Sequence, residues 1–227
     1  LYVHAPLALE VVATIGAVTA LFAATIAVVQ RDLKKILAYS TISQIGYMIL
    51  GVGVGAFSAG VFHLMTHAFF KALLFLGAGS VMHALHGELD VYKMGGLRKH
   101  LPMTSITFLV GTLAIAGVPP FAAFFSKDMV LEAAFAGGFH IQWFLGLAAA
   151  GLTAFYMFRA YFLAFGGESR MDPHTEKHVH ESPPNMTFPL AILALLSTVG
   201  GWWGLPHGVL WGDRFGAYLA PVLASPH

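Results

Sequence analysis

The stretch His63-Leu-Met-Thr-His67-Ala-Phe-Phe-Lys71 places three ionisable side chains inside an apolar run, residues 58–85. Four residues carry a helix about 40° past one full turn, so His63, His67 and Lys71 share one face. The run is long enough to cross a bilayer as a helix. Lys71 would then lie near the middle of the membrane, where a lysine costs about 2.5–3.5 kcal/mol. Because a buried lysine is this costly, we expect the face that carries it to have a function.

The composition indicates a polytopic membrane protein. Of the 227 residues, 57% are hydrophobic and 10% are charged, whereas a soluble domain has about 25% charged residues. The formal net charge of +1 gives no basis for nucleic-acid binding, and a chain without cysteine has no disulfides or thiolate metal sites. The chain begins at Leu1 with no basic signal region, so we expect an interior piece of a longer protein.

Apolar segments predict an all-α fold with about six transmembrane helices. A helix needs about 20 residues to cross the hydrocarbon core. The expected spans are residues 8–29, 36–57, 58–85, 102–135, 141–165 and 186–203. Residues 166–185 are expected to form a loop. Residues 204–227 are expected to form a truncated extramembrane tail, because they are too short and too interrupted by proline to span.

The span 102–135 is expected to be discontinuous. It is too long for one straight crossing, and Pro119-Pro120 interrupts it. Two prolines remove two backbone donors and clash with the preceding helical turn. Broken helices at membrane depth are tolerated where protein buries them or where they line a wet cavity. The second half of this span carries Lys127 and Asp128.

Lys71 and Lys127 are the two lysines expected away from the membrane surfaces. Lys71 has no acidic residue near it on its own helix, and its neighbours His63 and His67 are poor partners for an ammonium group. A line of one lysine and two histidines predicts a proton relay, because imidazoles exchange protons near neutral pH. For Lys127, the alternative is a structural ion pair with Asp128, its neighbour in sequence.

One side of the span 36–57 is unusually polar. Hydroxyl and amide side chains can hydrogen-bond between helices and can hold water inside a bundle. We expect these side chains, with one threonine of the next span, to line the pathway: Tyr39, Ser40, Ser43, Gln44 and Thr66. Glycines also follow in this span, and they favour close helix packing over a wet stretch.

The loop 166–185 contains His174, His178 and His180, a spacing that resembles a metal-binding tract. Charged neighbours and Pro183-Pro184 favour a solvated loop instead. No metal site is therefore predicted.

The loop charges predict the orientation in the membrane. Residues 30–35, 86–101 and 166–185 fall on one side of a six-span fold and carry lysine and arginine, whereas the loops near 51–60 and 136–140 carry neither. The positive-inside rule places the charged loops in the cytoplasm. The expected location is the bacterial inner membrane or an equivalent energy-converting membrane.

Four strings of sequence carry a resemblance to a known family. Residues 32–47, which read Asp-Leu-Lys-Lys-Ile-Leu-Ala-Tyr-Ser-Thr-Ile-Ser-Gln-Ile-Gly-Tyr, and residues 63–76 resemble the antiporter-like subunits of respiratory complex I. Met94-Gly-Gly-Leu-Arg98 and Phe124-Phe-Ser-Lys-Asp128 narrow the resemblance to the large L-type subunits of NADH:quinone oxidoreductase. The resemblance covers roughly residues 7–203.

The resemblance implies a fold of two inverted five-helix repeats. This chain would supply the second repeat, over residues 1–165, and one further helix, over residues 186–203. The resemblance also implies roles for individual residues in a half-channel. Lys71 would be the central lysine between the flanking His63 and His67, Lys127 with Asp128 would lead to the outer exit, and Lys34 would lie at the cytoplasmic end.

The implied function is proton translocation in a redox-driven complex. FMN, iron–sulfur clusters and quinone would belong to partner subunits, so no cofactor and no redox site is expected on this chain. The expected partners are other membrane-arm subunits, especially a neighbouring antiporter-like subunit. Two alternatives are a subunit of a multisubunit cation/proton antiporter or inorganic-carbon uptake complex, and a structural membrane subunit whose buried charges are only paired.

Overall fold

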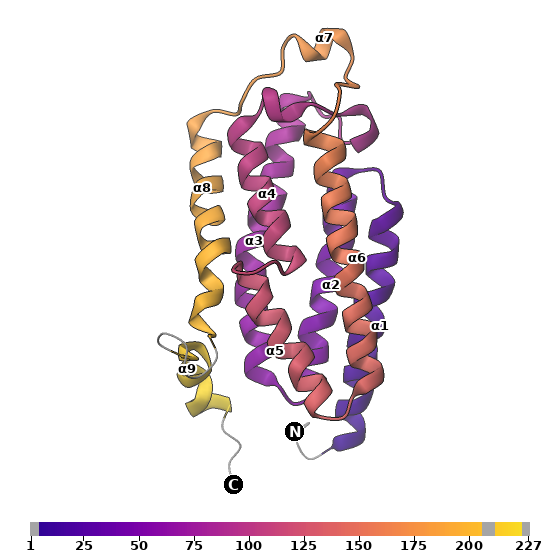
Figure 1. Cartoon of the computed structure of the whole chain (residues 1–227), viewed down its shortest axis with the longest axis vertical. Coiled ribbons are helices and arrows are strands. Elements are labelled where there is room, and N and C mark those ends of the chain that lie inside the picture. The colour runs from indigo at the N-terminus through magenta and orange to yellow at the C-terminus, as the bar shows by residue number, and fades with distance from the viewer. Residues whose placement is uncertain (1–4, 206–211, 224–227) are drawn as a thin grey trace.

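Long, nearly parallel helices form the bundle in the computed structural model, which describes residues 5–205 and 212–223 (Figure 1). Among the described residues, five segments are long and apolar enough to cross a membrane: α1 (Pro6–Val29), α2 (Leu33–Gly53), α3 (Phe57–Ala84), α6 (His140–Phe165), and α8 (Pro184–Val199) continued by η4 (Gly200–Trp203). The described residues contain isolated β-bridges but no β-strand. The predicted all-α membrane fold is therefore confirmed.

The broken span consists of two helices, α4 (Pro102–Ala116) and α5 (Ala122–Ala136). Gly117 ends α4 in the left-handed conformation with a φ of 76°, and the Pro119–Pro120 peptide bond is cis. Fifteen residues make a helix of about 22 Å, which is shorter than the membrane core of about 30 Å. Figure 1 shows the break about halfway along the bundle.

Local sequence signals set several helix ends. Pro6, Pro102 and Pro184 lie in first turns, where a missing N–H leaves no helical hydrogen bond unmade. Asp32 caps α2 by accepting a hydrogen bond from the Lys35 amide at 2.9 Å. The segment expected over residues 36–57 ends earlier, at Gly53. The reason is that Gly55, with a φ of 80°, turns the chain before α3 begins.

Helices α1 and α2 approach each other through small residues. The buried face of α1 consists of Gly16 and alanines. A methyl group built on Gly46 of α2 would lie 2.6 Å from the Ala20 amide nitrogen of α1. Small residues permit this close approach of two backbones inside a membrane. The opposite side of α1 exposes large apolar residues such as Phe22.

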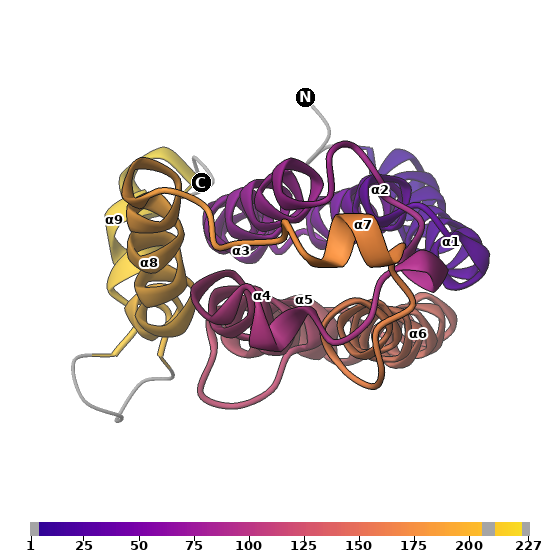
Figure 2. The ribbon, with the colours of Figure 1, turned by 90° about the horizontal axis from the view of Figure 1, so that it is seen from above.

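Three connections lie together at one end of the bundle (Figure 1). They include η2 (Val91–Lys93), η3 (Leu97–Lys99) and α7 (Pro173–Glu176). Seen from this end, α1, α2 and α3 form one row, α4–α5 and α6 form a second, and α7 lies between the rows (Figure 2). At the opposite end, α9 (Arg214–Leu223) lies within the predicted tail, of which residues 206–211 and 224–227 fall outside the described residues.

Candidate functional site

Buried ionisable side chains form a row through the middle of the bundle. His63 is fully buried, and His67, Lys71 and Lys127 are 8%, 5% and 4% exposed. The first three lie on one buried face of α3, and Lys127 lies on α5. The broken segment therefore brings its lysine to the same interior as the histidine–lysine face.

The Lys71 ammonium group donates a hydrogen bond to a main-chain oxygen of α2. Its Nζ atom lies 3.0 Å from the Leu37 carbonyl oxygen. It also lies 5.9 Å from the centre of the Phe75 ring. Within the described residues, no carboxylate forms an ion pair with Lys71. Neutral dipoles and an aromatic ring thus surround this cation.

The break between α4 and α5 supplies the acceptor for Lys127. Its Nζ atom lies 2.9 Å from the Ile115 carbonyl oxygen, in the last turn of α4. In a continuous helix, this oxygen would accept from residue 119, but residue 119 is a proline without an N–H. The negative end of the α4 dipole also points toward this position. Lys127 lies 5.1 Å from the centre of the Tyr47 ring.

Asp128 does not pair with Lys127. The Asp128 side chain is exposed, and no ion pair joins the two residues in the part of the chain that the structure describes. Adjacent residues on a helix point about 100° apart, so the carboxylate faces outward while the ammonium faces inward. The structural ion pair considered as the alternative for Lys127 is therefore not formed.

Hydrogen bonds around His63 join α2, α3 and α5. The His63 Nδ1 atom lies 2.9 Å from the Ser126 Oγ atom, and Nε2 lies 3.2 Å from the Gln44 Oε1 atom. The Ser126 Oγ atom lies 2.8 Å from the Thr66 hydroxyl. Ser126 precedes Lys127 on α5, so the hydrogen-bonded group of residues ends beside the second lysine.

The row has a gap around His67. The His67 Nε2 atom and the Gln44 Nε2 atom are buried and have no hydrogen-bond partner among the described residues. The His67 ring centre lies 6.4 Å from that of His63. A buried polar atom without a partner costs about 1–3 kcal/mol, and ordered water commonly occupies such positions. The gap is thus the place where water would complete the row.

The other residues predicted to line the pathway contact neighbouring helices and not the row of ionisable side chains. Ser43 donates to the Ala20 carbonyl oxygen at 2.8 Å, which joins α2 to α1. Ser40 accepts from the Tyr156 hydroxyl of α6 at 2.7 Å. Tyr39 is half-buried, and its ring packs beside the core. These contacts stabilise helix packing, so only Gln44 and Thr66 of the predicted lining bond to the row.

Lys34 lies at the loop end of α2, away from the row. Its Nζ atom lies 3.0 Å from the Met82 Sδ atom of α3. Lys34 precedes Leu37, whose carbonyl oxygen accepts from Lys71, by three residues. The Lys34 main chain thus lies about one helical turn of α2 from the residue that accepts from Lys71.

Ser126 and Tyr47 are site residues that the sequence prediction did not include. Ser126 bonds to His63, and Tyr47 lies over Lys127 with its ring centre 6.0 Å from that of His63. The Tyr47 hydroxyl donates to the Gly146 carbonyl oxygen, which fixes the ring. Their signals in the sequence are weak: Ser126 adjoins Lys127, and Tyr47 follows Gln44 by three residues.

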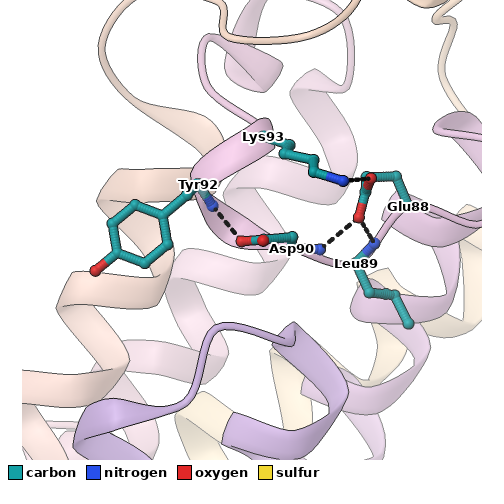
Figure 3. Close-up of polar contacts among 5 residues, drawn as sticks. All are labelled: Glu88, Leu89, Asp90, Tyr92 and Lys93. Carbon is teal, nitrogen blue, oxygen red and sulfur yellow. Dashed lines mark hydrogen bonds and ion pairs between the residues drawn. The ribbon is translucent and has the colours of Figure 1, made fainter.

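At the loop end, Lys93 and Glu88 form an ion pair. Figure 3 shows Glu88 accepting hydrogen bonds from the Leu89 and Asp90 amides and from Lys93, whose Nζ atom lies 3.0 Å away. The Asp90 amide, with the Lys93 ammonium next in importance, holds the pKa of Glu88 below its usual range. Arg159 donates to the Tyr92 hydroxyl at 3.1 Å and lowers the pKa of Tyr92.

The described residues form a helical membrane bundle with one broken helix and two buried lysines, which is the architecture of an antiporter-like membrane subunit. Residues 1–153 match the family described as "NADH:quinone oxidoreductase/Mrp antiporter, TM". The chain belongs to this family.

Relatives in this family are similar along nearly the whole chain. NAD(P)H-quinone oxidoreductase chain 5 of Picosynechococcus sp. is 50% identical over 94% of this chain, and NADH-quinone oxidoreductase subunit L of Rhodobacter capsulatus is 50% identical over 88%. The aligned regions cover 35% and 30% of these two relatives. The chain therefore spans about a third of the length of the curated relatives that it matches.

Solved structures share the fold. A chain of the Mrp complex from Dietzia sp. superposes with a TM-score of 0.81 over 95% of this chain and 47% of that chain, at 23% identity. A chain of a membrane-bound sulfane sulfur reductase, an archaeal respiratory membrane complex, gives a TM-score of 0.78 over 84% of this chain and 32% of that chain, at 29% identity. The antiporter-like fold predicted from the sequence is thereby confirmed.

Proposed function

We propose that this chain is part of a proton-translocating L-type membrane subunit of a redox-driven NADH:quinone oxidoreductase. The support is its 50% identity to chain 5 and subunit L proteins of that name. The Mrp chain shares the fold at only 23% identity. The oxidoreductase assignment is therefore preferred over a multisubunit cation/proton antiporter.

We propose that Lys71, His67, His63 and Lys127 relay the proton. The single observation that carries this proposal is the pair of buried ammonium groups, at 5% and 4% exposure, that bond to the carbonyl oxygens of Leu37 and Ile115. Without a carboxylate partner, each lysine can lose its proton without leaving a buried negative charge behind. Moving one charge across 100 mV requires about 2.3 kcal/mol, which a redox reaction in partner subunits would supply.

Hydrogen bonds around His63 would supply part of the route between the lysines. Hydroxyl and imidazole groups both donate and accept, so the Ser126–His63 contact of 2.9 Å can pass a proton in either direction. Water at the unpartnered His67 Nε2 atom would join His63 to Lys71. Asp128 faces outward, and its part in the relay would be to receive the proton that leaves Lys127.

We further propose the orientation and the partners of the chain. The loops 30–35, 86–101 and 166–185 would face the cytoplasm, because they carry the lysine and arginine residues that favour this side. Lys34 would then lie at the cytoplasmic end of the half-channel. Neighbouring membrane-arm subunits would cover the apolar faces, and FMN, iron–sulfur clusters and quinone would reside on other subunits.

The test is alanine replacement in the intact complex, reconstituted in vesicles. Lys71→Ala and Lys127→Ala are expected to lower NADH-driven proton pumping while the complex still assembles. Lys93→Ala is the matched control, because Lys93 is an exposed lysine paired with Glu88. Normal pumping with either interior variant would remove that lysine from the relay.

The antiporter alternative is tested by the neighbours of the chain. Co-purification with NADH-oxidising and quinone-binding subunits is expected. Co-purification with small antiporter subunits alone would contradict the oxidoreductase assignment.

A further inference from the structure

Four histidines line one cavity at the loop end of the bundle. The cavity has a volume of about 480 Å³, and Met82, His83 and His86 line it from the end of α3. His178 and His180 line it from the loop that follows α7. All four histidine side chains are exposed. Segments about 90 residues apart in sequence thus bring imidazoles to one water-accessible place.

Buried hydrogen bonds hold the loop in place over α3. The Ser182 Oγ atom lies 2.6 Å from the Ser80 Oγ atom, and both serines are buried. Glu181 accepts from the Met103 amide at 2.8 Å and from the Thr104 hydroxyl at 2.7 Å, at the start of α4. The two residues that follow His180 are therefore fixed to α3 and α4, so the loop histidines stay beside the cavity.

The cavity adjoins Met82, which contacts Lys34 at the loop end of α2. Met82 lines the cavity, and its Sδ atom accepts a hydrogen bond from Lys34 at 3.0 Å. One turn further along α2, the Leu37 carbonyl oxygen accepts from Lys71. The contacts Met82–Lys34 and Leu37–Lys71 thus connect the cavity, which is open to solvent, with the central lysine through the first turns of α2.

We propose that His83, His86, His178 and His180 form a proton-collecting site that supplies the interior row. This inference rests on the proposed function. Imidazole is the side chain whose protonation changes most readily near neutral pH. A histidine would take a proton from a buffer acid, leaving the conjugate base, and the imidazolium would release it toward Lys71 when that lysine is neutral.

The other charged groups near the cavity are engaged in contacts of their own, so the imidazoles are the groups available to collect protons. Lys34 is engaged with Met82, and the Glu181 carboxylate is engaged with α4. Glu88 follows His86 and pairs with Lys93. The His174 ring lies 5.1 Å from that of His178 and can extend the collecting surface outward. Within the described part of the chain, no group of three or more possible ligands is arranged to hold a metal ion.

The experiment replaces the four histidines by glutamine in the intact complex and measures NADH-driven proton pumping in vesicles. Wild-type and variant complexes are compared in weakly and strongly buffered media. We expect a severalfold loss in the weak buffer and near-normal pumping in the strong buffer, because mobile buffer can then deliver protons directly. Added imidazole should restore pumping in the weak buffer. Equal buffer dependence in wild type and variant would overturn the proposal.

Two controls separate this proposal from a general defect. His100→Gln changes a histidine of the same end that does not line the cavity, and it should pump normally in both media. If the fourfold variant fails to assemble, His178→Gln with His180→Gln, both in an exposed loop, gives the same test with a smaller loss. Failure of the relay itself would appear differently, as normal pumping by Lys71→Ala in every buffer.

Discussion

At the loop end of the bundle, Lys93 meets the Glu88 carboxylate at 3.0 Å, whereas in the interior Lys71 and Lys127 bond to the carbonyl oxygens of Leu37 and Ile115. The surface pair lies where water screens charge and contributes little to stability. The interior lysines lie where burial of a charge is costly, yet no carboxylate compensates them within the described residues.

The two environments differ in whether the lysine can readily lose its proton. An ion pair fixes the protonation state of both partners, because loss of the proton leaves an uncompensated carboxylate. A carbonyl oxygen accepts from an ammonium group but carries no net charge, so the amine can become neutral without that penalty. Under the proposed function, the two buried lysines are suited to proton exchange, whereas the Lys93–Glu88 pair holds fixed charges. Four variants test this contrast.

The largest effect is expected from Lys71→Arg. Arginine keeps its charge but holds its proton roughly a hundredfold more tightly than lysine in water, so the release step should slow by a comparable factor. NADH-driven proton pumping by the intact complex measures this loss. Lys93→Arg makes the same exchange beside Glu88 and should leave pumping unchanged. Normal pumping by Lys71→Arg would show that this lysine does not release its proton during transport.

Ser126→Ala should have the next largest effect. It removes the hydroxyl that contacts the His63 Nδ1 atom at 2.9 Å and Thr66 at 2.8 Å, in a fully buried position. A buried group left without its partner costs about 1–3 kcal/mol. Thermal unfolding in detergent should show this loss, and pumping should fall with it. Ser169→Ala, at an exposed serine, provides the baseline; an equal change in both would argue against the bridging role.

Glu88→Gln should have a smaller, pH-dependent effect. The pKa of Glu88 is lowered in the folded protein. The ionised carboxylate therefore stabilises the fold at every pH above the ordinary pKa of a glutamate. That contribution is lost as the pH falls through the lowered value. The Glu88 side chain is partly exposed to water, which screens its interactions, so the difference at neutral pH should be under about 1 kcal/mol. Unfolding measured across pH should show wild type and variant converging in acid; a constant difference would contradict the assignment.

Asp128→Asn should change stability least. The side chain is exposed and forms no ion pair with Lys127. A surface change of this kind typically stays within about 0.5 kcal/mol. Thermal unfolding of the chain in detergent measures it, with Lys127→Ala as the buried comparison. A loss of thermal stability as large as that of Lys127→Ala would indicate that Asp128 and Lys127 form a stabilising ion pair.

The sequence predicted the helices well because apolar length and proline positions determine them. Spans of about 20 apolar residues and the Pro119-Pro120 pair are visible in the sequence. The part of the chain that the structure describes has five helices long enough to span and a break at residues 117–121. Helical spacing also placed His63, His67 and Lys71 on one face, which the structure buries.

Contacts between helices were harder to predict, because they depend on how the helices rotate against one another. Nothing in the spacing shows that Ser126 meets His63, or that Ser40 and Ser43 face α6 and α1. The acceptor for Lys127 was also hidden. The Ile115 carbonyl oxygen becomes available because α4 ends at Gly117 and Pro119 lacks an N–H, and the Lys127 side chain reaches it from α5.

The close packing of α1 against α2 divides the bundle into a stiff part and a compliant part. A methyl group built on Gly46 would lie only 2.6 Å from the Ala20 nitrogen, so these two backbones pack too closely to admit even one added carbon. Beside the break, by contrast, a cavity of about 170 Å³ adjoins Gly117 and Lys127. Any mechanical movement during a transport cycle is therefore expected to bend the α4–α5 junction while α1 and α2 serve as its fixed support.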